Sequence, residues 1–491
     1  MIDLFDVIKT ISILWLILDW SIRILSVFIV PRNRRPSASL AWLMLIFLIP
    51  TLGFLLFIII GNPKLPLSRR QAQENLDDSM RQTTNQLRQR GAFSDLEATN
   101  ISKNYAHVAQ LSNNLTGLSP LKGNSISVLS DYDEILKSIV RDIDQAKKYI
   151  QLEYYIVAFD SSSEQIIEAL GRAVKRGVDT RVLYDWWASM RTPGYKKMRA
   201  ALDSHNILHL PILPFRPPGW GYVRPDLRNH RKLIAIDGRC GYVGSQNLIQ
   251  RNYHRKDELY YDEVVSRIEG PVVLQLSAVF ISDWYAETGK KLGQDQMKLT
   301  AEDVKPRGDS VAQILPSGPG YDDENNLKVF TAMIHAAKKS ITIVNPYFVP
   351  DEALMTAITS AAQRGVQVTM INSEAIDQWL VAHAQRSFYE ELLKDGVQLY
   401  LYNSPILLHS KYITIDDEVA IIGSSNLDIR SFLLALEVTM INYDHQVVAQ
   451  LNKVTTKYLK NSRPISLKQW QARPPRLLLL DNIARLTAAL Q

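Results

Sequence analysis

HRKLIAIDGRCGYVGSQN at residues 230–247 and HSKYITIDDEVAIIGSSN at residues 409–426 repeat one chemical pattern. Counted from the histidine, both copies place Lys at the second following position, Asp at the seventh, Ser at the fifteenth and Asn at the seventeenth. A single His-x-Lys is common on protein surfaces, but two copies in one register are not a coincidence. Two facing imidazoles suit covalent cleavage of a phosphodiester, because one attacks phosphorus while the other protonates the departing oxygen.

Each copy is expected to form a β-hairpin that begins just after its histidine. Residues 233–236 and 412–415 are apolar, β-type runs, and Gly238 and Asp417 fall where a turn belongs. Strand alternation puts the histidine and lysine of one copy on the same face, so that both reach one phosphate. The pattern therefore predicts a site built from both hairpins.

The candidate site residues follow from this placement. The candidate catalytic residues are His230, Lys232, Asp237, His409, Lys411 and Asp416. The two aspartates are included as members of the pattern, although their loop positions favour a bracing role. The candidate phosphate-binding residues, at the ends of the return strands, are Ser245, Asn247, Ser424 and Asn426. No acidic or His/Cys cluster has metal-ligand spacing, so a metal-free site without a cofactor is expected.

The surrounding sequence alternates strands and helices twice over. The expected strands are residues 149–156, 180–184, 340–345 and 366–371, and the expected helices are 131–146, 163–176, 327–339 and 352–364. AVKRGV at 173–178 is echoed by AAQRGV at 361–366. Such alternation is typical of an α/β fold with mixed, mainly parallel sheets flanked by helices. An internal duplication of this kind predicts two similar lobes related by a pseudo-twofold axis.

The N-terminus is strongly apolar. Residues 37–61 carry no charge and are long enough to cross a bilayer, while 11–30 is a second candidate that contains Asp19 and Arg23. Those two charges are four positions apart and can neutralise each other on one helix face. We therefore expect two transmembrane helices joined by a basic turn, and a cleaved signal peptide is disfavoured. The basic residues on the two sides are nearly balanced, so the orientation stays open.

Length and composition complete the expected organisation. The chain has 491 residues, a net charge of +6 and one cysteine, which excludes an intramolecular disulfide framework. Positive charge of this size is only a weak indication of an anionic partner. The expected divisions are a membrane domain over 1–62, a polar linker with a helix (67–91) over 63–120, a first lobe over 121–300 and a second lobe over 301–491.

At the repeated motifs the chain resembles the phospholipase D superfamily, whose signature is His-x-Lys-x4-Asp followed by Gly-Ser-x-Asn. The apolar segment with Ala41-Trp42, Pro50 and Gly53 resembles the membrane domain of bacterial cardiolipin synthases. Further matching segments are LEYYI at 152–156, RIEGP at 267–271, NPYFVPDE at 345–352 and NLDIRSF at 426–432. The resemblance spans roughly residues 36 to 443, and the NPYFVPDE run is the most specific to cardiolipin synthases.

The resemblance implies a two-step exchange through a phosphatidyl-histidine intermediate. One phosphatidylglycerol donates its phosphatidyl group, and a second one accepts it to give cardiolipin and glycerol. His230 is the implied nucleophile and His409 the implied proton donor, while Lys232 and Lys411 offset charge on the phosphoryl oxygens. Family alignment points to Glu263 and Glu437 as the residues that orient the histidines, with Asp262 a rival for the first lobe.

The implied partners are phosphatidylglycerol, other anionic phospholipids and the membrane, with no nucleic acid, and the implied location is the bacterial cell membrane as a multi-pass protein. Two departures from the family pattern, Ala435 in place of Asn and Glu263 in place of Asp, affect acceptor preference rather than the mechanism. Two other classes of function stay open. A membrane-tethered phosphodiester hydrolase would use the same residues with water as acceptor, and a scaffold protein with a dead site is disfavoured by the intact motifs.

Overall fold

The computed structural model describes residues 4–32, 34–71, 73–75, 96, 98, 101–215, 222–253, 258–290, 292 and 305–487. It divides into two compact units, Met1–Leu65 and Pro66–Gln491. Most of the helix expected over 67–91 lies outside the described residues.

The N-terminal unit contains one helix long enough to cross a bilayer and two that are too short. Helix α1 (Leu4–Ile29) holds the candidate span Ile8–Ile29, whose 22 residues rise about 33 Å. Helices α2 (Pro36–Leu48) and α3 (Pro50–Ile60) rise only about 20 and 16 Å, against a hydrocarbon core of about 30 Å. Among the described residues the expectation of two transmembrane helices is therefore not confirmed, and a multi-pass topology is not supported.

An interruption of the helix at Ile49 explains why the apolar run at 37–61 does not form one long helix. The residue leaves the helical region (φ −135°, ψ 79°), and Pro50 then starts α3 because its ring cannot continue the preceding helix. Gly53 lies so close to α2 that an added Cβ would be 2.9 Å from the Cα of Ile46. The apolar run thus folds back as a helical hairpin. In α1 the expected pairing of Asp19 and Arg23 is confirmed at 3.0 Å.

The second unit consists of two lobes, which we call lobe 1 (residues 121–288) and lobe 2 (residues 310–486 with helix α5). Lobe 1 is formed by β1 (Leu121–Leu129), α6 (Tyr132–Asp144), β2 (Tyr149–Tyr154), α7 (Glu164–Lys175), β3 (Asp179–Asp185), α8 (Trp186–Met190), α9 (Tyr195–Ser204), β4 (Leu208–Ile212), β5 (Arg228–Asn229), β6 (Lys232–Ile236), β7 (Cys240–Gly244), β8 (Tyr260–Asp262), β9 (Val265–Glu269) and α10 (Val273–Thr288). Lobe 2 is formed by α5 (Lys103–Thr116), β10 (Ser310–Ser317), α11 (Asn325–Ala336), β11 (Ser340–Val344), β12 (Phe348–Val349), α12 (Glu352–Gln363), β13 (Gln367–Ser373), α13 (Trp379–Lys394), β14 (Gln398–Tyr402), β15 (Ile406–Leu408), β16 (Tyr412–Ile415), β17 (Val419–Gly423), β18 (Leu427–Asp428), α14 (Ile429–Leu433), β19 (Ala435–Asn442), α15 (His445–Lys460), β20 (Ser462–Ile465), α16 (Leu467–Gln471) and α17 (Pro475–Leu486).

One sheet runs through both lobes in the order β20-β14-β13-β11-β16-β17-β19-β10-β1-β9-β7-β6-β2-β3-β4. The centre of the sheet is antiparallel. Among the described residues, the parallel pairs of this sheet join only β2–β3–β4, β11–β13–β14 and the short β5–β19. The expected α/β class with mixed sheets is correct, but the expectation of mainly parallel sheets is wrong. Hairpins β6–β7 and β16–β17, which carry the repeated motif, are antiparallel by construction and lie between the parallel strands and the lobe boundary.

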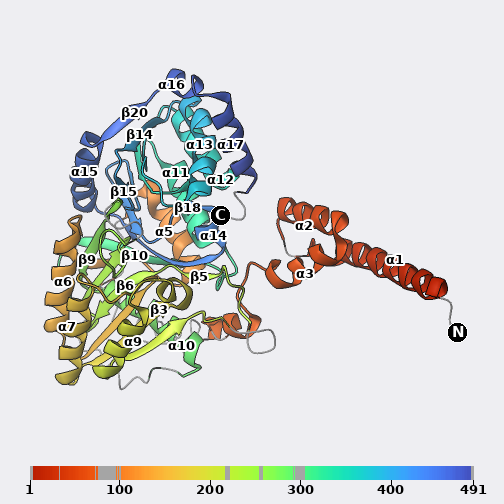
Figure 1. Cartoon of the computed structure of the whole chain (residues 1–491). Helices are drawn as coiled ribbons and strands as arrows, with labels where there is room; N and C mark the ends of the chain where they lie inside the picture. Colours follow the sequence, from red (N-terminus) through yellow and green to blue (C-terminus); the bar gives the residue numbers. More distant parts are fainter. Residues whose placement is uncertain are drawn as a thin grey trace. The chain divides into compact units, whose positions relative to one another are not determined.

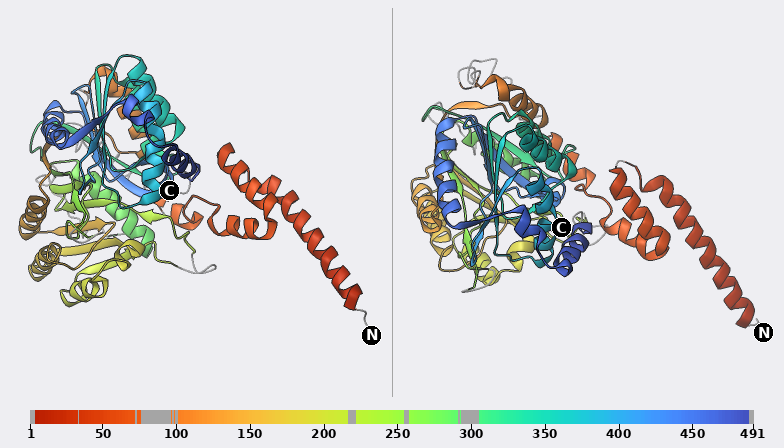
Figure 2. Two further views of the ribbon diagram at one scale, coloured as in Figure 1. Left: turned by 45° about the horizontal axis from the view of Figure 1, so that its top comes forward. Right: turned by 90° about the horizontal axis from the view of Figure 1, so that it is seen from above.

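Helices cover both faces of this sheet (Figures 1 and 2). In lobe 1, α6, α7 and α9 pack on one face and α10 on the other; in lobe 2, α11, α12 and α13 face α15 across the sheet. Helix α5, from the expected linker, contributes Tyr105 and Val108 to the core of lobe 2. The same layer order is repeated in the two lobes. The N-terminal ends of β6 and β16, which follow the motif histidines, lie near the boundary between the lobes.

Candidate active site

Each motif histidine is anchored on the opposite lobe. His230 follows β5, which pairs with β19 of lobe 2, and its backbone N–H donates to the Leu436 carbonyl at 2.8 Å. His409 follows β15, which pairs with β8 of lobe 1, and its N–H donates to the Asp262 carbonyl at 2.9 Å. The two exchanged strands therefore bring both histidines into a single site.

The two glutamates named by the sequence also cross between lobes. Nδ1 of His230 lies 2.9 Å from Oε1 of Glu437, and Nδ1 of His409 lies 2.8 Å from Oε1 of Glu263. Both carboxylates are buried. The rival Asp262 instead accepts hydrogen bonds from Tyr402 and Arg251. A carboxylate at Nδ1 holds the proton there and leaves Nε2 as the reactive nitrogen.

The two histidine–glutamate pairs differ in their electrostatics. Burial, together with Lys232 and Lys411, lowers the pKa of His230 well below its usual value. Burial raises the pKa of Glu437 to about 7. Burial also lowers the pKa of His409, but Glu263 opposes this shift, and attraction to His409 keeps the pKa of Glu263 below its usual value in spite of burial. His230 is thus the more strongly neutral imidazole, because the pKa of His409 is also lowered but Glu263 opposes that shift.

Two buried lysines supply the positive charge of the site. Nζ of Lys232 donates to the His230 carbonyl at 2.9 Å, and Nζ of Lys411 donates to the His409 carbonyl at 2.8 Å. Burial lowers the pKa of Lys232 to about 7 and that of Lys411 to about 8. An ammonium has three donors, so each lysine keeps donors for a phosphoryl oxygen. An anionic phosphodiester between them would raise both pKa values again.

The motif serines make hydrogen bonds with the backbone. The hydroxyl of Ser245 exchanges hydrogen bonds with the backbone of Val264, and that of Ser424 does the same with Val438 while also donating to Glu437. Both are fully buried. These hydroxyls hold the strands that carry the glutamates, and contact of Ser245 and Ser424 with the phosphate stays a prediction.

The motif asparagines keep unused hydrogen-bonding capacity. The Oδ1 atoms of Asn247 and Asn426 are buried without a hydrogen-bond partner in the structure. Since the oxygen and nitrogen of an amide exchange places by rotation, either residue can present a donor to a phosphoryl oxygen. Contact of Asn247 and Asn426 with the phosphate stays a prediction.

The motif aspartates stand at the far ends of their strands. Asp237 accepts hydrogen bonds from the backbone N–H groups of Lys147, Lys148 and Tyr149, and Asp416 accepts from those of 338–340 and from the Tyr105 hydroxyl. Each aspartate lies five positions after its lysine along an extended strand, which is a distance of about 16 Å. These hydrogen bonds favour the bracing role suggested by the loop positions of Asp237 and Asp416, and the catalytic assignment of the two residues stays untested.

Aromatic residues that the motif did not identify surround the histidines. Tyr155 packs edge-on against His230 with ring centroids 4.9 Å apart, and Tyr261 and Tyr347 approach His409 at 5.4 and 6.3 Å. The Tyr347 hydroxyl donates to Asp377 at 2.7 Å. Tyr155 directly follows β2 and Tyr347 lies three residues after β11, but the strand registers align Tyr347 with Ile156, so comparing the repeats would not have found this pair.

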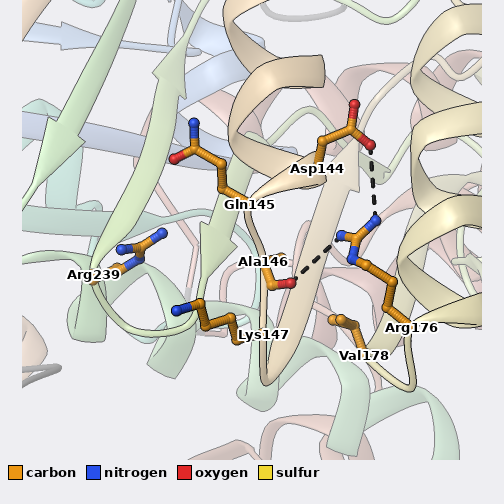
Figure 3. A pocket seen from close by; sticks show the side chains of 7 residues that line it. All are labelled: Asp144, Gln145, Ala146, Lys147, Arg176, Val178 and Arg239. Carbon is orange, nitrogen blue, oxygen red and sulfur yellow. Dashed lines mark hydrogen bonds and ion pairs between the residues drawn. The ribbon is translucent and has the colours of Figure 1, made fainter.

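A surface pocket of about 560 Å³ lies away from the histidines, at the other end of the lobe 1 strands. Figure 3 shows Arg176 in this pocket directed at Asp144 and at the Ala146 carbonyl. Arg364 of lobe 2 makes the same kind of contact with the carbonyls of Ile334 and Ala337. The arginine therefore ties a helix end to its neighbour in both lobes, and the pocket is not part of the active site.

Comparisons with known proteins agree with this geometry. The family model described as "Cardiolipin synthase, PLD-like domain" matches residues 139–284 and 330–458, and a phospholipase D-nuclease N-terminal model matches residues 13–62. The chain is 32% identical to "Cardiolipin synthase A" of Pectobacterium carotovorum over 459 residues (91% of each chain), and 32% identical to that of Wigglesworthia glossinidia brevipalpis over 483 residues (96% of this chain, 94% of the relative).

The fold is also similar to a solved structure. The phosphatidylserine synthase of Haemophilus influenzae superposes with a TM-score of 0.58 at 17% identity, covering 79% of this chain and 99% of that one. The family model alone matches more than half of the 491 residues. The chain belongs to the cardiolipin synthase family of phospholipase D-like proteins.

Proposed function

We propose that this chain is a phosphatidyltransferase that converts two phosphatidylglycerol molecules into cardiolipin and glycerol. The observation that carries the proposal is the crossed pair of histidine–glutamate contacts, which brings two imidazoles and two lysines into one buried site. The curated relatives named cardiolipin synthase support the choice of reaction. A phosphodiester is exchanged for a phosphodiester, so no nucleotide is needed to drive the reaction.

In the first step, Nε2 of neutral His230 attacks the phosphorus of one phosphatidylglycerol. A P–N bond forms, the P–O bond to the terminal glycerol breaks, and His409 donates a proton to the departing oxygen. The lower pKa of His230 and the carboxylate of Glu263 beside His409 support this division of roles. Positioned acid–base help of this kind contributes about 10²–10⁴ in rate.

In the second step, the terminal hydroxyl of another phosphatidylglycerol attacks the same phosphorus. The hydroxyl proton passes to His409, the P–N bond breaks, and His230 returns to its neutral form. Lys232 and Lys411 stabilise the charge that gathers on the phosphoryl oxygens in both steps. Asn247 and Asn426, with buried amide oxygens that lack a partner, are the proposed additional phosphate ligands.

The test uses the purified full-length chain with phosphatidylglycerol whose terminal glycerol is deuterated. We expect one labelled glycerol to be released for each cardiolipin formed, and the cardiolipin to retain one labelled bridging glycerol. The variants His230→Ala and His409→Ala should each abolish turnover, whereas His107→Ala, at an exposed histidine of α5, should not. Substantial activity in either motif variant would contradict the two-histidine mechanism.

The second candidate function is hydrolysis, which the same residues would perform with water as acceptor. In the labelled assay a hydrolase releases glycerol and phosphatidic acid without cardiolipin. Adding phosphatidylethanolamine identifies the donor, because a headgroup exchange from that lipid releases ethanolamine. A product ratio dominated by phosphatidic acid would replace the transferase proposal with this one.

A further inference from the structure

The C-terminal helix α17 buries its acidic side chain and exposes large apolar ones, which is the reverse of a helix on a water-facing surface. Its one acidic residue, Asp481, is only 2% exposed and faces the protein. There it contacts Nδ1 of His383 at 2.6 Å and accepts a hydrogen bond from Arg473 at 2.6 Å. Helix α17 packs against α13, beside which it lies in Figure 1, and the contact between Asp481 and His383 joins the two helices.

The outward side of α17 is apolar. Leu479, Ile483 and Leu486 are 62%, 52% and 83% exposed, and their spacing of three and four residues places them on one helix face. Leu480 lies beside them and is also exposed. A stripe of large apolar side chains in this position is typical of a surface that meets an apolar partner.

The apolar surface continues onto the first turn of α13. Trp379 and Leu380 are exposed there, and the Trp379 ring lies 4.4 Å from His383, the residue that holds Asp481. We call the combined set the α13–α17 surface: Trp379, Leu380, Leu479, Leu480, Ile483 and Leu486.

This surface begins close to the catalytic histidine of lobe 2. Asp377, two residues before Trp379, accepts a hydrogen bond from Tyr347, whose ring lies 6.3 Å from that of His409. The chain thus passes from the active site to the exposed tryptophan within a few residues. A molecule that covers the α13–α17 surface is therefore placed beside the site where phosphodiesters react.

Basic side chains accompany the apolar stripe. Arg476 and Arg485 are exposed on α17, and the guanidinium of Arg485 lies 4.4 Å from the centre of the Phe388 ring and 3.7 Å from the carboxylate of Glu391. Leucine, isoleucine and tryptophan with arginine beside them suit the boundary between acyl chains and anionic headgroups. A symmetric contact between two copies of α17 would instead bring like charges together.

We propose that the α13–α17 surface inserts into the headgroup layer of an anionic phospholipid bilayer and so delivers lipid directly to the active site. This contact is separate from the anchor formed by α1. The inference rests on the proposed function only in that the substrate is a bilayer lipid, and it holds equally for a transferase and a hydrolase.

The first test measures the depth of the surface in the membrane. A fluorophore is attached at Ile483→Cys, in a Cys240→Ala background, in the full-length chain reconstituted into phosphatidylglycerol vesicles. Lipids with brominated acyl chains should quench this label but not one at Lys137→Cys, an exposed position on α6 of lobe 1. An unquenched label at position 483, or equal quenching at both positions, would overturn the proposal and favour a protein partner such as a second copy.

The second test separates docking from chemistry. The double variant Leu479→Glu/Ile483→Glu is compared with Leu208→Glu, an exposed leucine on β4 of lobe 1. Turnover of phosphatidylglycerol vesicles should fall at least about tenfold in the double variant, equivalent to about 1.4 kcal/mol, while turnover of a monomeric short-chain phosphatidylglycerol stays unchanged. Equal losses on both substrates, or no loss on vesicles, would contradict docking. The identity of the product, cardiolipin or phosphatidic acid, reports separately on the proposed function.

Discussion

Replacing Glu437 by Gln removes the charge behind the proposed nucleophile while keeping its size. The carboxylate accepts a hydrogen bond from Nδ1 of His230 at 2.9 Å and another from Ser424. A hydrogen bond to a charged group contributes about 1.5–3 kcal/mol. If this interaction strengthens as positive charge develops on the attacking imidazole, its loss lowers kcat/KM by roughly 10- to 150-fold.

The pH dependence gives the more specific readout. Burial raises the pKa of Glu437 to about 7, so the ionised acceptor is present above that pH and is lost as the pH falls through it. The pKa of His230 lies well below its usual value, so this imidazole remains neutral over the same range. We therefore expect kcat/KM of the native chain to fall on the acid side of about pH 7, and this acid limb to disappear in Glu437→Gln.

Glu263→Gln is the matched control for this experiment. The pKa of Glu263 is lowered, so this carboxylate stays ionised through the measured range. Its replacement should reduce the rate but leave the acid limb where it is in the native chain. The assay is kcat/KM on monomeric short-chain phosphatidylglycerol against pH. Unchanged kcat/KM in Glu437→Gln, or an acid limb that persists in it, would refute the role given to this residue.

Three further outcomes are expected. Because burial lowers the pKa of Lys232 to about 7, kcat/KM should fall on the basic side as this ammonium deprotonates. The variant Lys232→Arg should move that basic limb to higher pH in the same assay. A basic limb that does not move would show that another group causes it. Asp416→Asn should lower the free energy of unfolding by about 2–4 kcal/mol, since three backbone N–H groups and Tyr105 lose a charged acceptor. The kcat per folded molecule should stay near the native value. A stable but inactive variant would show that Asp416 has a catalytic role. Gly53→Val should separate α2 from α3, because an added Cβ would meet Ile46 at 2.9 Å, and the melting temperature in detergent should fall; an unchanged value would argue against the hairpin.

The repeated motif carries information about local structure and about which distant segments form the candidate site. The runs after His230 and His409 are short, apolar and bounded by turns, so the hairpins β6–β7 and β16–β17 were predictable from local pattern alone. The exchange of strands was not, because nothing in residues 228–229 or 406–408 shows that they pair with the other lobe. Which glutamate serves which histidine follows from that exchange and therefore also needed the structure.

Composition was a poorer guide to the helix boundaries of the N-terminal unit and to the strand directions of the sheet. The charge-free run at 37–61 has the apolar length of a span, and Pro50 and Gly53 are tolerated in membrane helices, so the break at Ile49 could not be told from composition. Alternating helices and strands indicated parallel sheets, yet the hairpins that carry the motif make the centre of the sheet antiparallel. The serine hydroxyls satisfy neighbouring backbone groups, which a motif does not reveal.

The covalent intermediate is the most direct test of the two-step exchange. The full-length chain is mixed with short-chain phosphatidylglycerol, quenched within the first turnover in neutral denaturant and digested for mass spectrometry. We expect a phosphatidyl adduct on the peptide that contains His230, absent from the His409 peptide and from the variant His230→Ala. An adduct on His409, or cardiolipin formation with no adduct on either histidine, would contradict the mechanism.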